Sequence, residues 1–161
     1  MIIKFILNNM KKNLEADPND KLSEVLRNDF GLRSVNSCCN TGHCGGCTVL
    51  KDNMPVPACM VRMFSVRNSS ILTYEYISTT KEFSTISSVL ETGGCHFCEF
   101  CRYGKMLTIY SMVMNSAQLT DNDIYEKLSG NICNCTDFQS LATAIRQAIN
   151  AIKRGKRAEH R

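Results

Sequence analysis

The sequence lacks a hydrophobic run long enough to cross a bilayer. Its best candidate, MLTIYSMVM at 106–114, is short and contains Thr108 and Ser111. At the N-terminus, the apolar residues of MIIKFILNN are interrupted by Lys4 and followed directly by polar residues, which is not the pattern of a secretory signal peptide. These features predict a soluble, cytoplasmic protein that has no membrane partner.

The chain also lacks an internal repeat, a low-complexity linker and any recognisable catalytic acid, base or nucleophile. The formal net charge of +4 is a weak indication of nucleic-acid binding, because much of the positive excess lies in KRGKRAEHR at 153–161. A charged run at a chain end is typically a solvated terminus. We therefore expect no nucleic-acid partner and no catalytic residue in this chain.

Cysteine, in contrast, is abundant, with ten among the 161 residues. The cysteines form two groups, at 38–59 and at 95–135, and the chain between the groups contains none. In a reducing compartment, closely spaced thiols are more often metal ligands than disulfide partners. Small hydrophobic cores commonly need such a metal for stability. Two separate cysteine groups therefore predict two metal-stabilised domains.

Hydrophobic and turn patterns predict a different secondary structure in each half of the chain. The first half shows one helical pattern, in 21–31, with Gly31 at its end, among strand patterns at 2–7, 11–16, 48–52 and 71–77. The second half shows helical patterns around 83–91 and at 104–115, 120–128 and 137–153. The sequence therefore predicts an α+β protein with a strand-rich half followed by a helical half.

The first cysteine group has the spacing C-x4-C-x2-C-x11-C. Its members are Cys39, Cys44, Cys47 and Cys59. Plant-type ferredoxins hold a [2Fe–2S] cluster with this spacing. Gly42, Gly45 and Gly46 permit the dihedral angles that a loop around a cluster needs, and they let backbone N–H groups approach the sulfurs. Zinc is the alternative metal, but zinc sites typically pair distant C-x2-C knuckles. Cys38 and His43 are then surplus residues of the loop.

The second cysteine group lies in GGCHFCEFCRYG and SGNICNCTDFQS, each at the start of a predicted helix. Free N–H groups and the dipole at a helix N-terminus favour bound negative charge. Two such helix ends can hold a second anionic cluster through one C-x2-C and one C-x-C pair. Cys133 and Cys135 form the C-x-C pair. Both Cys95–Cys98 and Cys98–Cys101 are C-x2-C pairs, and the spacing leaves the choice between them open.

Together, these motifs resemble the iron–sulfur subunit of the molybdenum hydroxylases, the xanthine dehydrogenase and aldehyde oxidase family. The resemblance covers nearly the whole chain. That family joins a β-grasp, plant-type ferredoxin-like domain to a helical domain with the motifs C-G-x-C-T-P-G and G-N-x-C-R-C-T-G-Y. The latter motif appears here at 130–138. The former aligns best at 98–104, which places Gly104 on the family glycine and Gly94 on another that usually lies a few residues upstream.

The resemblance implies an α+β fold, with a β-grasp (plant-type ferredoxin-like) domain at 1–77 and a four-helix-bundle domain at 78–161. It also implies two [2Fe–2S] clusters. The implied ligands are Cys39, Cys44, Cys47 and Cys59 for the first cluster, and Cys98, Cys101, Cys133 and Cys135 for the second. Cys38 and Cys95 are then surplus, and we expect both to act as small buried hydrophobic residues.

The implied function is that of the non-catalytic electron-transfer subunit of an oxidoreductase complex. Electrons would pass from a molybdopterin-binding large subunit, which hydroxylates a heterocycle or an aldehyde, to the second cluster. They would continue to the first cluster and then to an FAD-binding subunit. The alternative is a stand-alone iron–sulfur redox-sensing or ferredoxin-like module with a different partner. Stable co-purification with a molybdopterin subunit and a flavoprotein would distinguish these two functions.

The second cysteine group departs from the family pattern at several positions. The departures are Glu99, Arg102, Tyr103, Asn134, Asp137 and Phe138. In addition, Phe97 stands where the family usually has a glutamine whose amide hydrogen-bonds the pterin. Phenylalanine cannot make that hydrogen bond. We therefore expect a reshaped docking surface, on which Phe97 packs against the partner or meets a modified, displaced or absent pterin.

Overall fold

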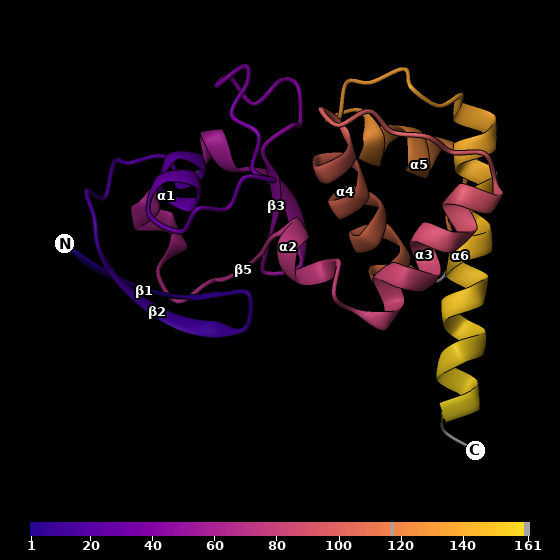
Figure 1. The fold of residues 1–161 in the computed structure, drawn as a ribbon, viewed down its shortest axis with the longest axis horizontal. Helices are drawn as coiled ribbons and strands as arrows, with labels where there is room; N and C mark the ends of the chain where they lie inside the picture. The colour runs from indigo at the N-terminus through magenta and orange to yellow at the C-terminus, as the bar shows by residue number, and fades with distance from the viewer. Residues whose placement is uncertain (117, 160–161) are drawn as a thin grey trace.

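The structure is a computed structural model that describes residues 1–116 and 118–159. Its strands and α-helices are, in chain order, β1 (Ile2–Leu7), β2 (Met10–Glu15), α1 (Leu22–Asn28), β3 (Thr48–Lys51), β4 (Met54–Pro57), β5 (Ser70–Leu72), α2 (Tyr74–Ile77), α3 (Lys81–Thr92), α4 (Arg102–Asn115), α5 (Asp121–Leu128) and α6 (Phe138–Glu159). The sheet and α1 lie side by side with the helices α3 to α6, and α2 lies between them (Figure 1). This arrangement confirms the predicted α+β class.

The five strands form one mixed sheet in the order β2-β1-β5-β3-β4. Strand β1 pairs antiparallel with β2 and parallel with β5, while β3 pairs antiparallel with β4 and β5. The turn between β1 and β2 uses Asn8 and Asn9, which have φ angles of 51° and 63°. Asparagine tolerates such positive angles, and they match the twist of a tight hairpin. The strands predicted at 2–7, 11–16 and 48–52 are confirmed to within a residue or so at each end.

The strand predicted at 71–77 is only partly correct. Strand β5 ends at Leu72, and the next residues form the short helix α2. The helix buries Ile77 completely. It also places the ring of Tyr74 against Phe83, with 5.4 Å between the ring centroids. Tertiary packing therefore overrides the β-propensity of these residues.

Strand β4 was not predicted from the sequence. It contains Pro55 and Pro57, and proline lacks the N–H group that a central strand needs. The structure places β4 at the edge of the sheet, where a strand has only one hydrogen-bonded neighbour. The prolines are therefore compatible with this strand, although they conceal it in the sequence.

The strand-rich half buries its own apolar core beneath α1. Alternate residues of β1 point into this core and are buried, as are Leu22, Val25 and Leu26 of α1. Gly31 follows the helix with a φ angle of +66°, a left-handed conformation that favours glycine. The helix predicted in 21–31 is therefore confirmed at Leu22–Asn28, but its capping residue is Asp29, and Gly31 lies two residues beyond the cap.

The second half consists of the four helices α3 to α6 around a second apolar core. All four predicted helices are confirmed, and α6 continues beyond the predicted end at residue 153. Helix α5 begins with the predicted capping box, in which Thr120 and Asp123 each bond the backbone of the other. The core extends to Leu50 of β3 and Ile77 of α2, so packed side chains join the two halves.

Within the part of the chain that the structure describes, none of the helices combines the length and the apolar character required to traverse a bilayer.

Candidate metal centres

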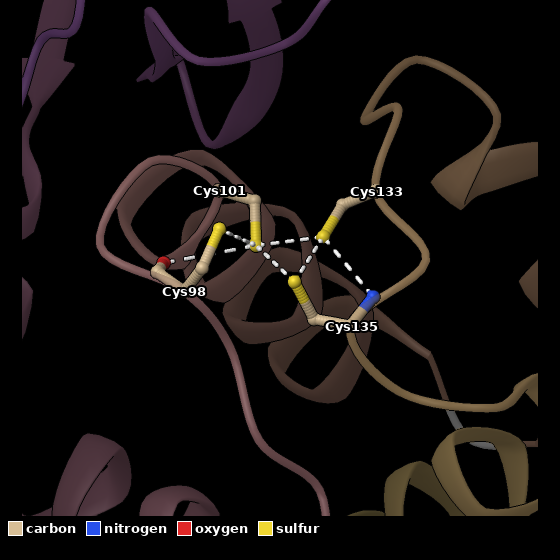
Figure 2. A group of neighbouring side chains, drawn as sticks. All are labelled: Cys98, Cys101, Cys133 and Cys135. Carbon is tan, nitrogen blue, oxygen red and sulfur yellow. Dashed lines mark hydrogen bonds between the residues drawn. The ribbon is translucent and has the colours of Figure 1, made fainter.

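Four thiols converge where the loop between α3 and α4 meets the loop between α5 and α6 (Figure 2). They belong to Cys98, Cys101, Cys133 and Cys135, and their sulfur atoms all lie within 4.8 Å of one another. The sulfur of Cys133 is 2.9 Å from those of Cys101 and Cys135, and the sulfurs of Cys98 and Cys101 are 3.5 Å apart. Four cysteine sulfurs brought together are the donor set that a [2Fe–2S] cluster takes.

Helix α4 positions the first two of these thiols. Cys101 is the residue that caps the start of α4, and the backbone N–H of Arg102 donates to the carbonyl of Cys98 at 3.0 Å. This hydrogen bond closes the C-x2-C turn and directs both side chains to the same side. Cys133 and Cys135 lie in the loop that leads into α6, and the N–H of Cys135 donates to the Cys133 sulfur at 3.3 Å.

Three hydrogen bonds connect the two loops and the start of α4. The backbone N–H of His96 donates to the hydroxyl of Thr136 at 3.0 Å, and that hydroxyl donates to the carbonyl of His96 at 2.5 Å. The ammonium of Lys105 donates to the carbonyl of Cys133 at 3.1 Å. The relative position of the two cysteine pairs is therefore fixed by the hydroxyl of Thr136 and the ammonium of Lys105, which lies in α4.

The acidity of these thiols differs strongly within the group. Hydrogen bonds from the backbone and thiol of Cys101 lower the pKa of Cys98 to about 7, while burial raises the pKa of Cys101 itself. Burial also acts to raise the pKa of Cys133, but hydrogen bonds with Cys101 and Cys135 and the charge of Lys105 lower it overall. Thiols bind metals as thiolates, so metal binding here is coupled to proton release.

The first cysteine group lies in the loop before β3 and in the short turn of 3-10 helix Ala58–Met60. Backbone N–H groups approach three of its sulfurs: Thr41 to Cys39 at 3.5 Å, Gly46 to Cys44 at 3.4 Å, and Cys59 to Cys47 at 3.4 Å. Such N–H···S contacts stabilise negative charge on sulfur and were expected for this loop. Within residues 1–116 and 118–158, only the second cysteine group brings three or more potential ligand atoms close together.

The loop that carries the first cysteine group, which we call the first loop, changes direction through residues with positive φ angles. Asn40, Gly42 and Gly45 have φ angles of 55°, 75° and 71°. Hydrogen bonds from the hydroxyl and backbone of Thr41 lower the pKa of Cys39 to about 5. The backbone N–H groups at these sulfurs are those that a cluster-binding loop needs, but within residues 1–116 and 118–158 the four sulfurs of this group do not converge as those of the second group do.

The two surplus cysteines occupy different environments. Cys95 is buried in the helical core, with 4% of its surface exposed, and its thiol points to the carbonyl of Gly93. Burial raises its pKa. Cys38, in contrast, is exposed, so the expectation that it is buried is wrong. Its thiol contacts that of Cys44, and its pKa is raised by partial desolvation and by its cysteine neighbours.

The two cysteine groups touch through a small set of residues that sequence reasoning did not identify. The backbone N–H of Ile132 donates to the carbonyl of Cys44 at 3.3 Å. The amide of Asn131 donates to the carbonyl of Gly45 at 3.2 Å and accepts from the Thr108 hydroxyl at 2.7 Å. Asn131 belongs to the G-N-x-C motif, which is the signal that could have indicated its role.

Glycine is required where α4 approaches the first loop. A methyl group added at Gly104 would lie 2.0 Å from the carbonyl oxygen of Gly45, and one added at Gly45 would lie 2.2 Å from the carbonyl oxygen of Gly130. No side chain fits such a contact. The glycine aligned with the family motif therefore allows the two loops to meet directly.

The positions that depart from the family motifs surround the second group on the surface. Glu99, Asn134 and Asp137 are exposed. Phe97 is partly buried against the helical core, and its ring centroid lies 5.9 Å from the ammonium nitrogen of Lys105. Lys105 was not singled out in the sequence, although a lysine beside the apolar run MLTIYSMVM is a visible signal.

The fold and the converging thiols define an iron–sulfur protein, and comparison with known proteins agrees. Residues 73–146 match the family described as the [2Fe-2S] binding domain. The chain is 32% identical over 147 residues to the nicotinate dehydrogenase small FeS subunit of Eubacterium barkeri, covering 91% of this chain and 94% of that protein. It is 31% identical to the xanthine dehydrogenase iron-sulfur-binding subunit of Escherichia coli O157:H7, and the match covers 89% of this chain and 91% of that protein.

Solved structures show the same likeness. One chain of quinoline 2-oxidoreductase from Pseudomonas putida 86 superposes with a TM-score of 0.83 at 27% identity, covering 96% of this chain and 97% of that one. The aldehyde oxidoreductase from Desulfovibrio desulfuricans ATCC 27774 superposes with a TM-score of 0.82 at 31% identity, and the match covers 96% of this chain and 17% of that chain. The present chain belongs to the iron–sulfur subunits of the xanthine dehydrogenase and aldehyde oxidase family, the molybdenum hydroxylases.

Proposed function

We propose that this chain is the electron-transfer subunit of a molybdenum hydroxylase complex, in which it relays electrons from a molybdopterin-binding large subunit to an FAD-binding subunit. The observation that carries the proposal is the convergence of Cys98, Cys101, Cys133 and Cys135. The relatives are named as small or iron-sulfur-binding subunits of dehydrogenases, so larger partner subunits are expected here too.

The proposal includes two [2Fe–2S] clusters, one in each half of the chain. A β-grasp domain at 1–77 would hold the first cluster through Cys39, Cys44, Cys47 and Cys59, and a four-helix-bundle domain at 78–161 would hold the second through the four converging cysteines. The two apolar cores support this division, although Leu50 and Ile77 of the first half pack into the second core. The N–H groups directed at the sulfurs of Cys39, Cys44 and Cys47 support the first site.

Each cluster, when bound, supplies a centre that accepts and releases one electron. The chain itself supplies thiolates, N–H donors and exclusion of water, since Cys47 and Cys59 are only 2% exposed. The hydrogen bond between Ile132 and Cys44 joins the residue before Cys133 directly to a cysteine of the first group. This short connection between the two cysteine groups supports passage of electrons from one site to the other.

Metal analysis and EPR spectroscopy of the anaerobically purified complex test the proposal. We expect four irons per chain and two distinguishable EPR signals after reduction. Co-purification with a molybdopterin subunit and a flavoprotein is also expected. A single cluster or a four-iron cubane would contradict the assignment of the cysteines, and isolation as a monomer would favour the redox-sensing alternative. The cytoplasmic location expected from the sequence stays a prediction.

Phe97 adds a specific expectation about the interface with the molybdopterin subunit. Its ring offers neither a strong donor nor a strong acceptor, so we propose that this subunit makes no hydrogen bond to a pterin at this position. A buried pterin group left unpaired there costs about 1–3 kcal/mol. A structure of the complex provides the test. A pterin beside Cys98 whose polar edge is hydrogen-bonded to this subunit would contradict the proposal.

A further inference from the structure

A buried lysine beside the second cysteine group has no part in the function proposed so far. Lys105 lies in the first turns of α4, four residues after Cys101, and is only 4% exposed. Its neighbours Met106 and Leu107 belong to the helical core. Removing an ammonium group from water is costly unless another charge or a set of hydrogen bonds compensates it. The surroundings of Lys105 must therefore supply that compensation.

Two neighbours hold the ammonium in place. It donates to the carbonyl of Cys133 at 3.1 Å, and it lies 5.9 Å from the ring centroid of Phe97. A carbonyl oxygen and the face of an aromatic ring both attract a cation. An ammonium has three donors, and a single protein acceptor satisfies only one of them. The polar contacts within the chain are therefore too few to offset the burial of the charge.

No carboxylate compensates Lys105 either. Across residues 1–116 and 118–158, none lies within 4.0 Å of its ammonium nitrogen. Asp137 lines the same cavity of about 410 Å³, but its carboxylate accepts from the backbone N–H of Ser140 at 2.9 Å and so caps the start of α6. The negative charge that matches Lys105 must come from elsewhere.

The four converging thiols provide that negative charge when they bind iron. Lys105 contacts the backbone of Cys133, whose sulfur is 2.9 Å from two of the other sulfurs. Four thiolates carry more negative charge than a [2Fe–2S] core neutralises, and reduction adds one more electron. The potential of such a cluster depends on its net charge and on the charges and hydrogen bonds around it.

We propose that Lys105 is the counter-charge of the second cluster and that its ammonium stabilises the reduced form, raising the reduction potential of that cluster relative to the first. This inference rests on the proposed function, because it requires a [2Fe–2S] cluster at these four cysteines. A raised potential makes the second cluster a better acceptor for electrons that enter from the partner. Phe97 then has a role within this chain, since its ring covers the ammonium.

The test is an EPR-monitored redox titration of the iron-loaded full chain and three variants. Lys105→Met removes the charge and the hydrogen bond, Lys105→Gln removes the charge and keeps a donor, and Lys105→Arg keeps both. Lys81→Met, at an exposed lysine at the start of α3, is the matched control. We expect the Met and Gln variants to weaken reduction of the second cluster about tenfold, which is about 59 mV for one electron.

The other reduction potentials should not change. The first cluster should keep its potential in every variant, and Lys105→Arg and Lys81→Met should leave both potentials as in the wild type. A potential that falls in the Met variant but not in the Gln variant would show that the hydrogen bond acts and the charge does not, which overturns the proposal. Unchanged potentials in both would also overturn it.

A variant that loses the second cluster gives no potential for that cluster. If Lys105→Met does not retain the second cluster, the comparison of Lys105→Gln with Lys105→Arg decides the question by itself. Loss of that cluster in all three variants would show a purely structural role and overturn the proposal. Failure of the proposed function is distinguishable, because then the unsubstituted chain would already lack two [2Fe–2S] signals.

Discussion

The two cysteine groups are built in different ways. The second group lies between loops that lead into α4 and α6, and packing of these elements brings all four sulfurs within 4.8 Å of one another. The first group lies on a loop shaped by positive φ angles at Asn40, Gly42 and Gly45, and its sulfurs are met mainly by backbone N–H groups. Helix packing thus organises one site and local backbone conformation the other. The two sites should therefore respond differently to substitution.

Loss of a single thiol should have the largest effect and should separate the two groups. Cys101→Ser should remove the second cluster and Cys39→Ser the first, because a hydroxyl is a much poorer ligand for iron than a thiolate. Each variant should lose about half of its iron and one of the two EPR signals. Iron analysis with EPR on the purified chain is the measurement. Loss of both signals in either variant would show that the sites do not assemble independently.

Gly104→Ala should disturb both groups at once. The added methyl would lie 2.0 Å from the carbonyl oxygen of Gly45, so the two loops must separate. We expect the free energy of unfolding to fall by about 1–3 kcal/mol, as for other overpacked sites. Chemical denaturation measures this change, and EPR should show both signals altered.

Gly155→Ala in α6 is the matched control for that substitution. Nothing lies within 4 Å of a methyl group at this position. Alanine is a better helix former than glycine by about 1 kcal/mol, so this variant should be as stable as the wild type or more stable. Equal stability of the Gly104 and Gly155 variants would contradict the close contact between the loops.

Asn131→Ala should weaken the same contact without forcing the two loops apart. The side chain is 8% exposed and bonds Gly45, Thr48 and Thr108. Its removal leaves buried polar groups unpaired, at a cost of about 1–3 kcal/mol in unfolding free energy. Asn122→Ala on the exposed side of α5 is the control and should change stability little. If the two variants unfold at the same denaturant concentration, the bridge through Asn131 contributes nothing to stability.

The surplus cysteines should show the smallest effects. Cys38→Ser and Cys95→Ser should each leave the iron content unchanged, because Cys38 lies outside the C-x4-C-x2-C-x11-C spacing and Cys95 lies outside the converging group. Cys95→Ser should lower the unfolding free energy by about 1 kcal/mol or more, since it places a hydroxyl in an apolar core. Iron analysis and denaturation of the two variants test this. Iron loss in Cys95→Ser would mean that Cys95 and Cys98 form the ligand pair.

Local patterns in the sequence were sufficient to predict most of the secondary structure. The alternation in β1, the amphipathic periods of α3 to α6 and the capping residues of α5 depend on residues close together in the chain. Prediction failed where distant contacts decide the conformation. The prolines of β4 are tolerated because that strand lies at an edge, and Tyr74 starts a helix because it packs on Phe83.

The sequence by itself determined the chemistry of the site, because the number and spacing of cysteines are properties of the chain that indicate thiolate ligands for iron. The spacing alone did not decide which sulfurs meet, and the tertiary structure did. Spacing is equal for Cys95–Cys98 and Cys98–Cys101, but helix packing places Cys101 with Cys133 and Cys135 and buries Cys95 in the core. The same packing buries Lys105 beside Cys133, because only the folded chain brings α4 against the loop before α6.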